Sequence, residues 1–237
     1  MKLFKSLCLL TIAISALGSA QAQEAVIRKH LSERLTNFPK IDEVSKTPMP
    51  GLFELRVNGT DIFYTDAEGS YLIQGNLIDT KSARNLTEER MEKLTAVAFD
   101  SLPIKDAFTI VRGSGKRKMA VFEDPNCGYC KRFERDLQNV NNVTVHMFLY
   151  PVLGADSLDK SKNIWCAKDK PKVWQDTMVR DIPVPKVSCD TTAIDRNLDF
   201  GRKLRITGTP TIIFADGSRV PGAISAAQVE KFLTEVK

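Results

Sequence analysis

Cys127 and Cys130, separated by two residues, are the most reactive pair of side chains that the sequence offers. They follow an apolar segment at Met119–Phe122 and an Asp-Pro-Asn turn, which predicts that a strand ends and a helix begins just before them. We expect Asn126 to cap this helix and Cys127 to lie in its first turn, where unpaired backbone N–H groups and the helix dipole stabilise a thiolate. The i, i+3 spacing brings both sulfur atoms to one side of that turn.

This pair is suited to thiol–disulfide exchange. A thiolate of low pKa attacks a disulfide bond, and a second thiol within reach then releases the resulting mixed disulfide. We predict that Cys127, at the exposed end of the helix, is the attacking cysteine and that Cys130, one turn deeper, is the resolving cysteine. The Cys127–Cys130 disulfide is then the redox-active group, and we expect no other cofactor.

Two other uses of the Cys127–Cys130 pair are weaker interpretations. Two cysteines at this spacing can be half of a zinc site, but the sequence has no second such pair, and its two histidines, His30 and His146, lie far apart. A purely structural disulfide would close so small a loop that it removes little chain entropy. We therefore predict no metal site. We expect each histidine to lie on the surface or to be buried in the core with hydrogen-bond partners for its ring.

The first 22 residues have the three parts of a secretory signal peptide. Lys2 and Lys5 precede an apolar run at residues 7–17, and small residues lead to Ala22. The run is shorter than the roughly 20 residues that a membrane-spanning helix needs. We expect cleavage after Ala22, which removes Cys8 from the five cysteines and leaves two pairs in a protein exported to an oxidising compartment.

The second pair, Cys166 and Cys189, flanks a segment that contains Pro183 and Pro185. In the chain-entropy model, a disulfide that closes this loop stabilises the fold by about 3 kcal/mol. We therefore interpret Cys166 and Cys189 as a structural disulfide that stays oxidised while the first pair cycles.

The composition excludes several classes of protein. With 43% hydrophobic and 27% charged residues in 237, the chain has a core-forming composition and reads as one or two folded domains. The formal net charge of +5 includes the two lysines of the signal peptide, so the rest of the chain is nearly balanced. Such a balance does not indicate a nucleic-acid partner. We also predict no membrane-spanning segment after the signal peptide.

The predicted helices and strands form two domains, each of which combines helices with a sheet. We therefore predict an α+β fold. Residues 23–84 are expected to form a small domain of one amphipathic helix, at 24–38, packed on an antiparallel sheet that includes a hairpin turn at Asn58-Gly59. A domain of this size is marginal alone, and a second copy could cover its sheet edges. Asn85 and Glu88 form a capping-box pattern that opens a linker helix at 85–103.

Residues 104–237 have the order of elements of an α/β sandwich with a helical insertion. We expect strands at 108–111, 119–122, 143–150 and 210–214, and helices at 127–138, over most of 157–206 and at 226–236. The strand at 210–214 begins with Pro210 after Gly-Thr, where a cis peptide bond could be built in. The residues alone favour neither the cis nor the trans form.

The motif at 127–130, the Gly-Thr-Pro before a late strand and the helical insertion together resemble the thioredoxin fold. The signal peptide, the small N-terminal domain and the linker helix make the whole mature chain similar to the DsbC/DsbG family of periplasmic disulfide isomerases. The resemblance implies that Thr209 and Pro210, with Pro210 cis, lie beside Cys127 and pair with a substrate strand. It also implies substrate contacts for Gly128 and Tyr129.

The resemblance further implies the partners of the protein. The N-terminal domain, cystatin-like in this family, is expected to form a homodimer whose cleft holds misfolded disulfide-bonded exported proteins. The membrane protein DsbD is expected to keep the Cys127–Cys130 pair reduced in the periplasm. Gly128-Tyr129 and Thr209 favour the DsbC branch. The alternatives are a DsbG-like reductase that protects single cysteines, a net oxidase, and a chaperone whose thiols are incidental.

Overall fold

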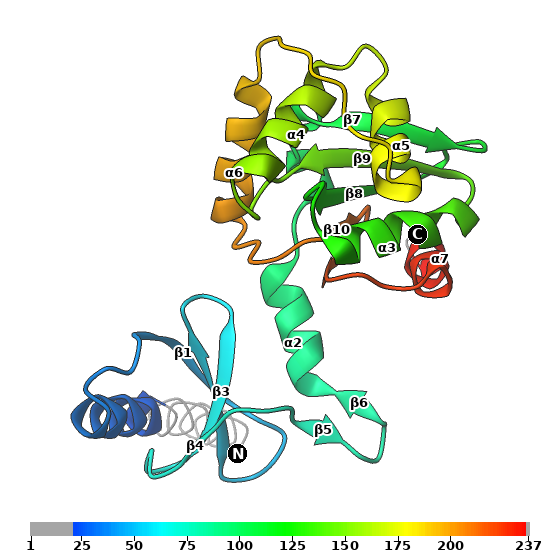
Figure 1. The fold of residues 1–237 in the computed structure, drawn as a ribbon. Helices are drawn as coiled ribbons and strands as arrows, with labels where there is room; N and C mark the ends of the chain where they lie inside the picture. Colours follow the sequence, from blue (N-terminus) through cyan, green and yellow to red (C-terminus); the bar gives the residue numbers. More distant parts are fainter. Residues whose placement is uncertain (1–20, 236–237) are drawn as a thin grey trace, which may run out of the picture. The chain divides into compact units, whose positions relative to one another are not determined.

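The computed structural model describes residues 21–235, which form two compact units: the first ends at Leu94 and the second begins at Thr95 (Figure 1). The predicted signal peptide, residues 1–22, lies outside the described residues except for its last two positions, and Cys8 lies outside them too. Each unit has a hydrophobic core of its own.

The first unit is a helix over residues 21–34 packed on a four-stranded antiparallel sheet. The helix places Ile27 and Leu31 on one face, and both pack against Ile41, Leu55 and Val57 of the sheet. The predicted combination of a helix and an antiparallel sheet is therefore confirmed. The strands, in their order of pairing, are β1 Ile41–Lys46, β2 Leu52–Val57, β3 Asp61–Asp66 and β4 Leu72–Ile73.

The strands of this unit differ from the prediction at both edges of the sheet. Strand β1 was not predicted, because a bulge between Ile41 and Glu43 interrupts the alternation of apolar and polar residues. The sequence predicts a single strand at 71–78, whereas the structure divides this segment into β4 and, separately, β5 Ile78–Asp79, which pairs with β6 Arg84–Asn85.

Helix α2, Leu86–Thr95, follows the first unit's strands, and the hydroxyl of its buried Thr87 forms a hydrogen bond with the hydroxyl of Tyr64 in β3. The Oδ1 of Asn85 accepts the N–H of Glu88 at 3.2 Å, as the capping pattern predicts. Arg90 donates to Glu54 Oε1 and to Glu43 Oε2, both at 2.9 Å, which ties the helix to the sheet. The expected helix at 85–103 is wrong in its extent. It ends at Thr95, because the N–H of Val97 bonds to Gly217 O of the second unit instead of continuing the helical pattern.

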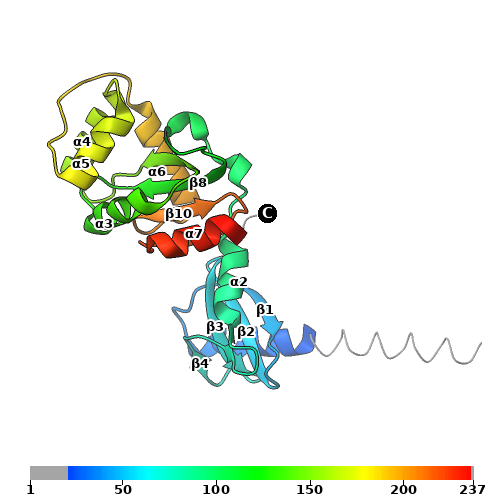
Figure 2. The same ribbon diagram turned by 90° about the vertical axis from the view of Figure 1, so that its right-hand side faces the viewer.

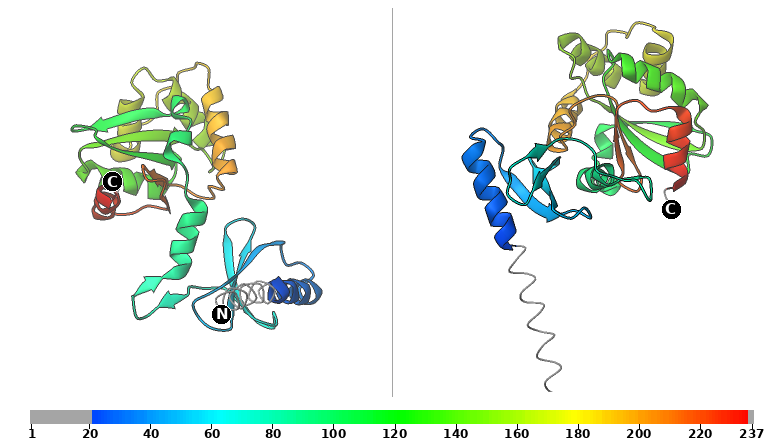
Figure 3. Two further views of the ribbon diagram at one scale, coloured as in Figure 1. Left: turned by 180° about the vertical axis from the view of Figure 1, so that it is seen from behind. Right: turned by 90° about the horizontal axis from the view of Figure 1, so that it is seen from below.

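The second unit is a five-stranded sheet in the order β11-β10-β8-β9-β7, flanked by helices. Strands β8 and β9 are parallel, and the other neighbouring pairs are antiparallel. Figures 2 and 3 show this unit from further directions. Its strands are β7 Phe108–Arg112, β8 Arg117–Glu123, β9 Val143–Leu149, β10 Thr211–Phe214 and β11 Arg219–Pro221. Its helices are α3 Gly128–Asp136, α4 Ala155–Cys166, α5 Lys170–Arg180, α6 Thr192–Lys203 and α7 Ala226–Glu235.

The alternation of side chains along the central strand β8 separates two cores. Met119 and Val121 belong to the cluster that includes residues of α3, α5 and α7. Ala120 and Phe122 belong to the other cluster, against which Leu198 of α6 packs. Every side chain of β8 from Met119 onward is therefore buried, which explains its continuous apolar run.

The connections of the sheet could not be obtained from the spacing of elements. Strands β7 and β8 are joined by a short turn that contains Gly113-Ser114-Gly115, but they are not neighbours in the sheet, because β9 lies between them. The insertion between β9 and β10 contains α4, α5 and α6. Cys166, at the end of α4, forms a disulfide bond with Cys189, in the segment before α6.

Candidate active site

The two cysteines lie where β8 leads into α3. Cys127 has an extended backbone conformation and is itself the N-cap of α3, since its Sγ accepts the N–H of Cys130 at 3.3 Å. The prediction that Asn126 caps the helix is therefore wrong. The Asn126 side chain instead donates to Asp156 Oδ2 at 2.7 Å and to Ser157 Oγ at 3.0 Å. Because Cys127 takes the cap position, its sulfur receives the helix N–H groups directly.

Asp124 holds the loop that leads into the cysteines. It is completely buried, and its Oδ1 accepts the N–H of Asn126 at 2.8 Å and the hydroxyl of Ser157 at 2.7 Å. Its Oδ2 accepts the N–H groups of Val152 at 2.8 Å and of Leu153 at 3.0 Å. Asp124 thus joins the approach to α3 to the loop after β9, a role that sequence reasoning missed.

We expect the Asp124→Asn variant to lower the free energy of unfolding by about 3 kcal/mol, because an amide NH₂ replaces one of the oxygens and faces buried donors. Urea denaturation of the reduced protein measures this loss. The matched control is Ser157→Ala, which removes one donor to Asp124 and should lower the free energy of unfolding by about 1 kcal/mol. Equal losses in the two variants would contradict the central role of Asp124.

The surroundings of Cys127 favour its thiolate. Its pKa is lowered from an ordinary value of 9.0 to about 5, first by a hydrogen bond with the Cys130 side chain. The Thr209 side chain and the backbone N–H groups of Cys130 and Tyr129 lower it further, while burial opposes them. Cys127 is therefore ionised at neutral pH, as an attacking cysteine must be.

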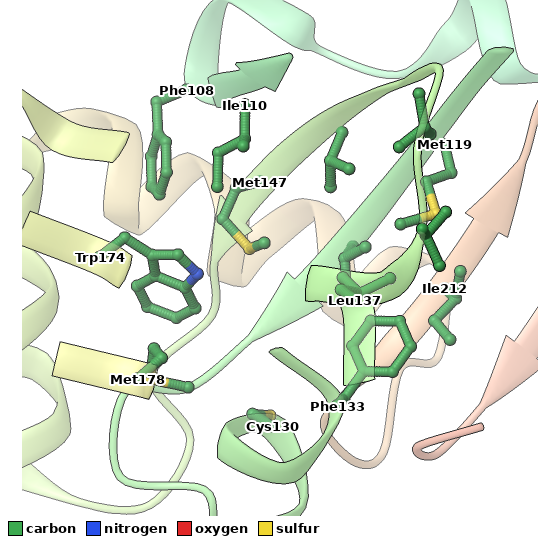
Figure 4. Close-up of a cluster of buried hydrophobic side chains, with 14 of the residues drawn as sticks. Phe108, Ile110, Met119, Cys130, Phe133, Leu137, Met147, Trp174, Met178 and Ile212 are labelled. Carbon is green, nitrogen blue, oxygen red and sulfur yellow. The ribbon is translucent and has the colours of Figure 1, made fainter. Parts of the chain in front are cut away.

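Cys130 has the opposite character. It has no exposed surface, whereas Cys127 keeps 6% of its surface exposed. In Figure 4 it belongs to the buried cluster that also contains Phe133, Trp174 and Met178. Burial raises the pKa of Cys130 above all, and the hydrogen bond to Cys127 and the charge of Glu123 raise it further. Cys130 is therefore a protonated thiol beneath an ionised one.

The structure brings the predicted Thr209–Pro210 segment to the cysteines. The peptide bond between Thr209 and Pro210 is cis. The backbone oxygen of Thr209 lies 3.2 Å from Cys127 Sγ, which donates to it when protonated. Gly128 and Tyr129 are exposed beside them, Tyr129 by 69%, and open space surrounds the position where a Cβ of Gly128 would lie. All six residues predicted at the redox site thus lie together.

Glu123, the last residue of β8, is a site residue that sequence reasoning missed. It is completely buried, and neither of its carboxyl oxygens has a hydrogen-bond partner. Burial, above all, raises its pKa well above the ordinary value of 4.5, and the charges of Glu134 and Cys127 raise it further. The signal was present in the sequence, since Glu123 ends an apolar strand and alternates with Met119 and Val121 on the face toward α3.

The rest of the described chain shows no competing metal site. Among residues 21–235, no group of three His, Cys, Asp or Glu side chains could hold a metal ion. His30 bonds to Glu68 O at 2.7 Å, and His146 lies 3.3 Å from the Thr109 hydroxyl. Within the same residues, no helix has the length and apolar character needed to cross a membrane.

Comparisons with known proteins cover both units. Residues 104–237 match the thioredoxin-like domain family, and residues 18–88 match the disulfide bond isomerase protein N-terminal domain. The solved structure of a disulfide interchange protein from Neisseria gonorrhoeae matches with a TM-score of 0.54 and 34% identity over 56% of this chain and 97% of that chain.

Two curated relatives match over most of their length. The probable thiol:disulfide interchange protein DsbC of Bordetella pertussis is 45% identical over 215 residues, which are 90% of this chain and 76% of the relative. The thiol:disulfide interchange protein DsbC of Escherichia coli K12 is 29% identical over 238 residues, 98% of this chain and 96% of the relative. With a redox-competent cysteine pair at the start of α3 and both domains matched, the chain belongs to the DsbC family of thiol:disulfide interchange proteins.

Proposed function

We propose that this protein isomerises and reduces incorrect disulfide bonds of exported proteins through a mixed disulfide on Cys127. The opposite pKa shifts of the two cysteines carry this proposal, because they provide an ionised attacking sulfur and a protonated resolving sulfur three residues apart. The position of Cys127 at the N-cap of α3 supports the same assignment.

The reaction has two outcomes. The Cys127 thiolate attacks one sulfur of a client disulfide, which forms the Cys127–client bond and releases the other client sulfur as a thiolate. In isomerisation, a client thiolate attacks the client sulfur of the mixed disulfide, a new client disulfide forms, and Cys127 leaves as a thiolate. In reduction, Cys130 attacks the Cys127 sulfur, the Cys127–Cys130 disulfide forms, and the client leaves with both sulfurs reduced.

Glu123 is proposed as the group that takes the proton of Cys130 during reduction. Its buried carboxyl oxygens, which have no hydrogen-bond partner among the described residues, and its electrostatic interaction with Cys130 support this role. We expect Glu123→Gln to slow the attack of Cys130 by about a hundredfold, because an amide cannot accept the proton.

The reaction of the reduced protein with the aromatic disulfide dithio-bis-nitrobenzoate measures this step, because each of two successive reactions releases one coloured aromatic thiolate. One equivalent of dithio-bis-nitrobenzoate reacts with reduced Cys127 in a first phase, and the attack of Cys130 releases the second thiolate in a second phase. Glu123→Gln should leave the first phase nearly unchanged, and a second phase as fast as that of the unmodified protein would refute the role of Glu123.

Exposed apolar side chains near the redox pair support an unfolded client segment as the substrate. Tyr129 is 69% exposed, and the loop fixed by Asp124 exposes Val152 by 43% and Leu153 by 56%. The backbone of Thr209 and Pro210, next to Cys127, is proposed to pair with the same segment. Such contacts recognise an extended chain and little of its sequence.

The remaining proposals concern the setting of the reaction. We propose that cleavage after Ala22 yields a periplasmic protein, that DsbD keeps its redox pair reduced, and that Cys166–Cys189 is structural. The domains are proposed at 23–84 and 104–237, with the linker at 85–103. The first of them is proposed to form a homodimer, supported by the match to the isomerase N-terminal domain and by its small core.

Recovery of a scrambled disulfide-bonded client, without added oxidant, tests the proposed function. The mature protein should restore client activity in catalytic amounts when a trace of reductant keeps Cys127 free. A client that becomes reduced without rearrangement would identify a reductase and contradict isomerisation. Sedimentation of the mature protein as a monomer at micromolar concentration would contradict the homodimer.

A further inference from the structure

Three positively charged side chains follow the redox pair on α3. Lys131, Arg132 and Arg135 all lie within five residues of Cys130, and each has exposed surface. The backbone N–H of Lys131 donates to Cys127 O at 3.0 Å, so Lys131 lies one helical turn, about 5.4 Å, from the attacking cysteine. Nothing in the reaction described so far uses these charges.

Asp181 pairs with two of these cations from the end of α5. Lys131 Nζ donates to Asp181 Oδ1 at 2.6 Å, and a terminal guanidinium nitrogen of Arg135 donates to Asp181 Oδ2 at 3.1 Å. The hydrogen bond from Lys131, and then the charge of the same residue, lower the pKa of Asp181, so its carboxyl group is ionised at neutral pH. We call Lys131, Arg135 and Asp181 the Asp181 cluster.

The backbone fixes Asp181 where it can reach both cations. Asp181 is the C-cap of α5 and has a left-handed conformation, with φ 56°. The next residue, Ile182, donates its N–H to Asp176 O at 2.9 Å and accepts the hydroxyl of Thr177 at 3.3 Å. Asparagine tolerates the same left-handed conformation and is found at the ends of helices. The Asp181→Asn variant therefore removes a charge and keeps this turn.

The Asp181 cluster acts on approaching molecules more than on the fold. All three of its side chains are partly exposed, and ion pairs at exposed sites contribute little to stability. The field of exposed charges nevertheless extends into the solution over the Debye length, which is about 30 Å at 0.01 M salt. Because the cluster begins one helical turn from Cys127, its charge influences which disulfides reach the Cys127 thiolate.

We propose that Asp181 is a specificity-determining residue, whose carboxylate offsets the charges of Lys131 and Arg135 beside Cys127 and so limits the preference of the redox site for acidic client segments. This inference rests on the proposed function and adds the class of client segment that the site favours. Two cations and one anion give the cluster a net charge of +1, which becomes +2 without the anion. The larger charge attracts a disulfide flanked by acidic residues and repels one flanked by basic residues.

Small disulfides of different charge test the proposal in a Cys130→Ser background, where only the attack of Cys127 is followed. The probes are dithio-bis-nitrobenzoate, a dianion, cystamine, a dication, and hydroxyethyl disulfide, which is neutral. The attack joins one half of the probe to Cys127 and releases the other half as a thiolate, and the gain in protein mass measures its rate. Division by the rate with the neutral probe gives relative rates that are free of changes in the reactivity of Cys127 itself.

The expected effect of Asp181→Asn has opposite signs for the two charged probes. At about 0.01 M salt, the relative rate should rise about threefold with dithio-bis-nitrobenzoate and fall about threefold with cystamine. At 1 M salt, where the Debye length is about 3 Å, both differences should disappear. Peptides that share one disulfide and differ only in flanking glutamate or lysine residues should follow the anionic and the cationic probe, respectively.

Two control variants separate the effect of charge from a change in structure. Asp199→Asn removes the acidic partner of Arg202 on α6, whose Leu198 packs against the other core cluster, and should leave the relative rates unchanged. Lys131→Met removes one cation of the Asp181 cluster and should change the relative rates in the direction opposite to Asp181→Asn. The double variant of Lys131 and Asp181 again has a net charge of +1 and should behave as the unmodified cluster does.

The inference about Asp181 and the proposed function can fail independently. Relative rates that do not change in Asp181→Asn at low salt overturn the role of Asp181, even if the unmodified protein isomerises its client. A change that persists at 1 M salt, or that the double variant does not cancel, also overturns it, because its cause is then not charge. Rates that depend on charge as expected, in a protein that fails to rearrange a scrambled client, support the role of Asp181 and refute the proposed isomerase function.

Discussion

The Cys127→Ser variant is expected to lose all rearrangement and reduction of scrambled client, to the level of the uncatalysed reaction. A serine hydroxyl is not ionised at neutral pH and cannot form the mixed disulfide, so neither outcome of the reaction can begin. The measurement is the recovery of client activity together with the count of client thiols. Because Cys127 lies at the N-cap of α3 and serine is a favoured N-cap residue, the fold should tolerate the change.

The matched variant is Cys130→Ser, which keeps the attacking sulfur. It should still rearrange the client but accumulate mixed disulfides, since the internal route of release is lost. Suppression of client aggregation should survive in both variants if the exposed apolar side chains bind unfolded chains. Residual rearrangement by Cys127→Ser would show that another group carries the reaction.

Alkylation of Cys127 by iodoacetamide is expected to depend little on pH between about pH 6 and pH 8, and to fall to half near pH 5, where the thiolate becomes protonated. The sign follows from the lowered pKa: the reactive form is present above about 5 and is lost as the pH falls through that value. In the unfolded chain, with an ordinary cysteine pKa, the rate should instead rise about a hundredfold over the same two pH units.

Variants at position 130 test the cause of this shift. In Cys130→Ser, Cys127 is the only free thiol of the described chain, and the hydroxyl can still donate to its sulfur. In Cys130→Ala, the largest of the interactions that lower the pKa of Cys127 is lost, so the midpoint of the alkylation profile should lie at higher pH than in Cys130→Ser. Identical midpoints would exclude the side chain of residue 130 as the main cause.

The sequence predicted those parts of the site that depend on neighbours in the chain. The three-residue step from Cys127 to Cys130 determines that both sulfurs share one helical turn, whatever the rest of the fold does. The apolar run of β8 and the Gly-Thr-Pro before β10 likewise predict buried strands. The proximity of Thr209 to Cys127 came from a family resemblance, because no local pattern brings together residues so far apart.

The features that were missed depend on contacts across the fold. Asp124 and Glu123 are adjacent acidic residues in the sequence, yet the carboxyl group of Asp124 accepts four hydrogen bonds and that of Glu123 accepts none. Two of the four donors to the Asp124 carboxyl group are the N–H groups of Val152 and Leu153 in the loop after β9, and a third is the hydroxyl of Ser157 in α4. In the same way, Asn126 does not cap α3, because its side chain donates hydrogen bonds to Asp156 and Ser157 at the start of α4. Competition between local and distant partners is not visible in a single sequence.

Because Cys166 and Cys189 form a disulfide bond, this protein itself depends on the correct pairing of its cysteines. The described chain has four cysteines, and four thiols can pair completely in three ways. Only the pairing that leaves Cys127 and Cys130 to each other gives a working catalyst. A newly made chain must therefore reach the correct pairing of its own cysteines before it can act on the disulfide bonds of other proteins.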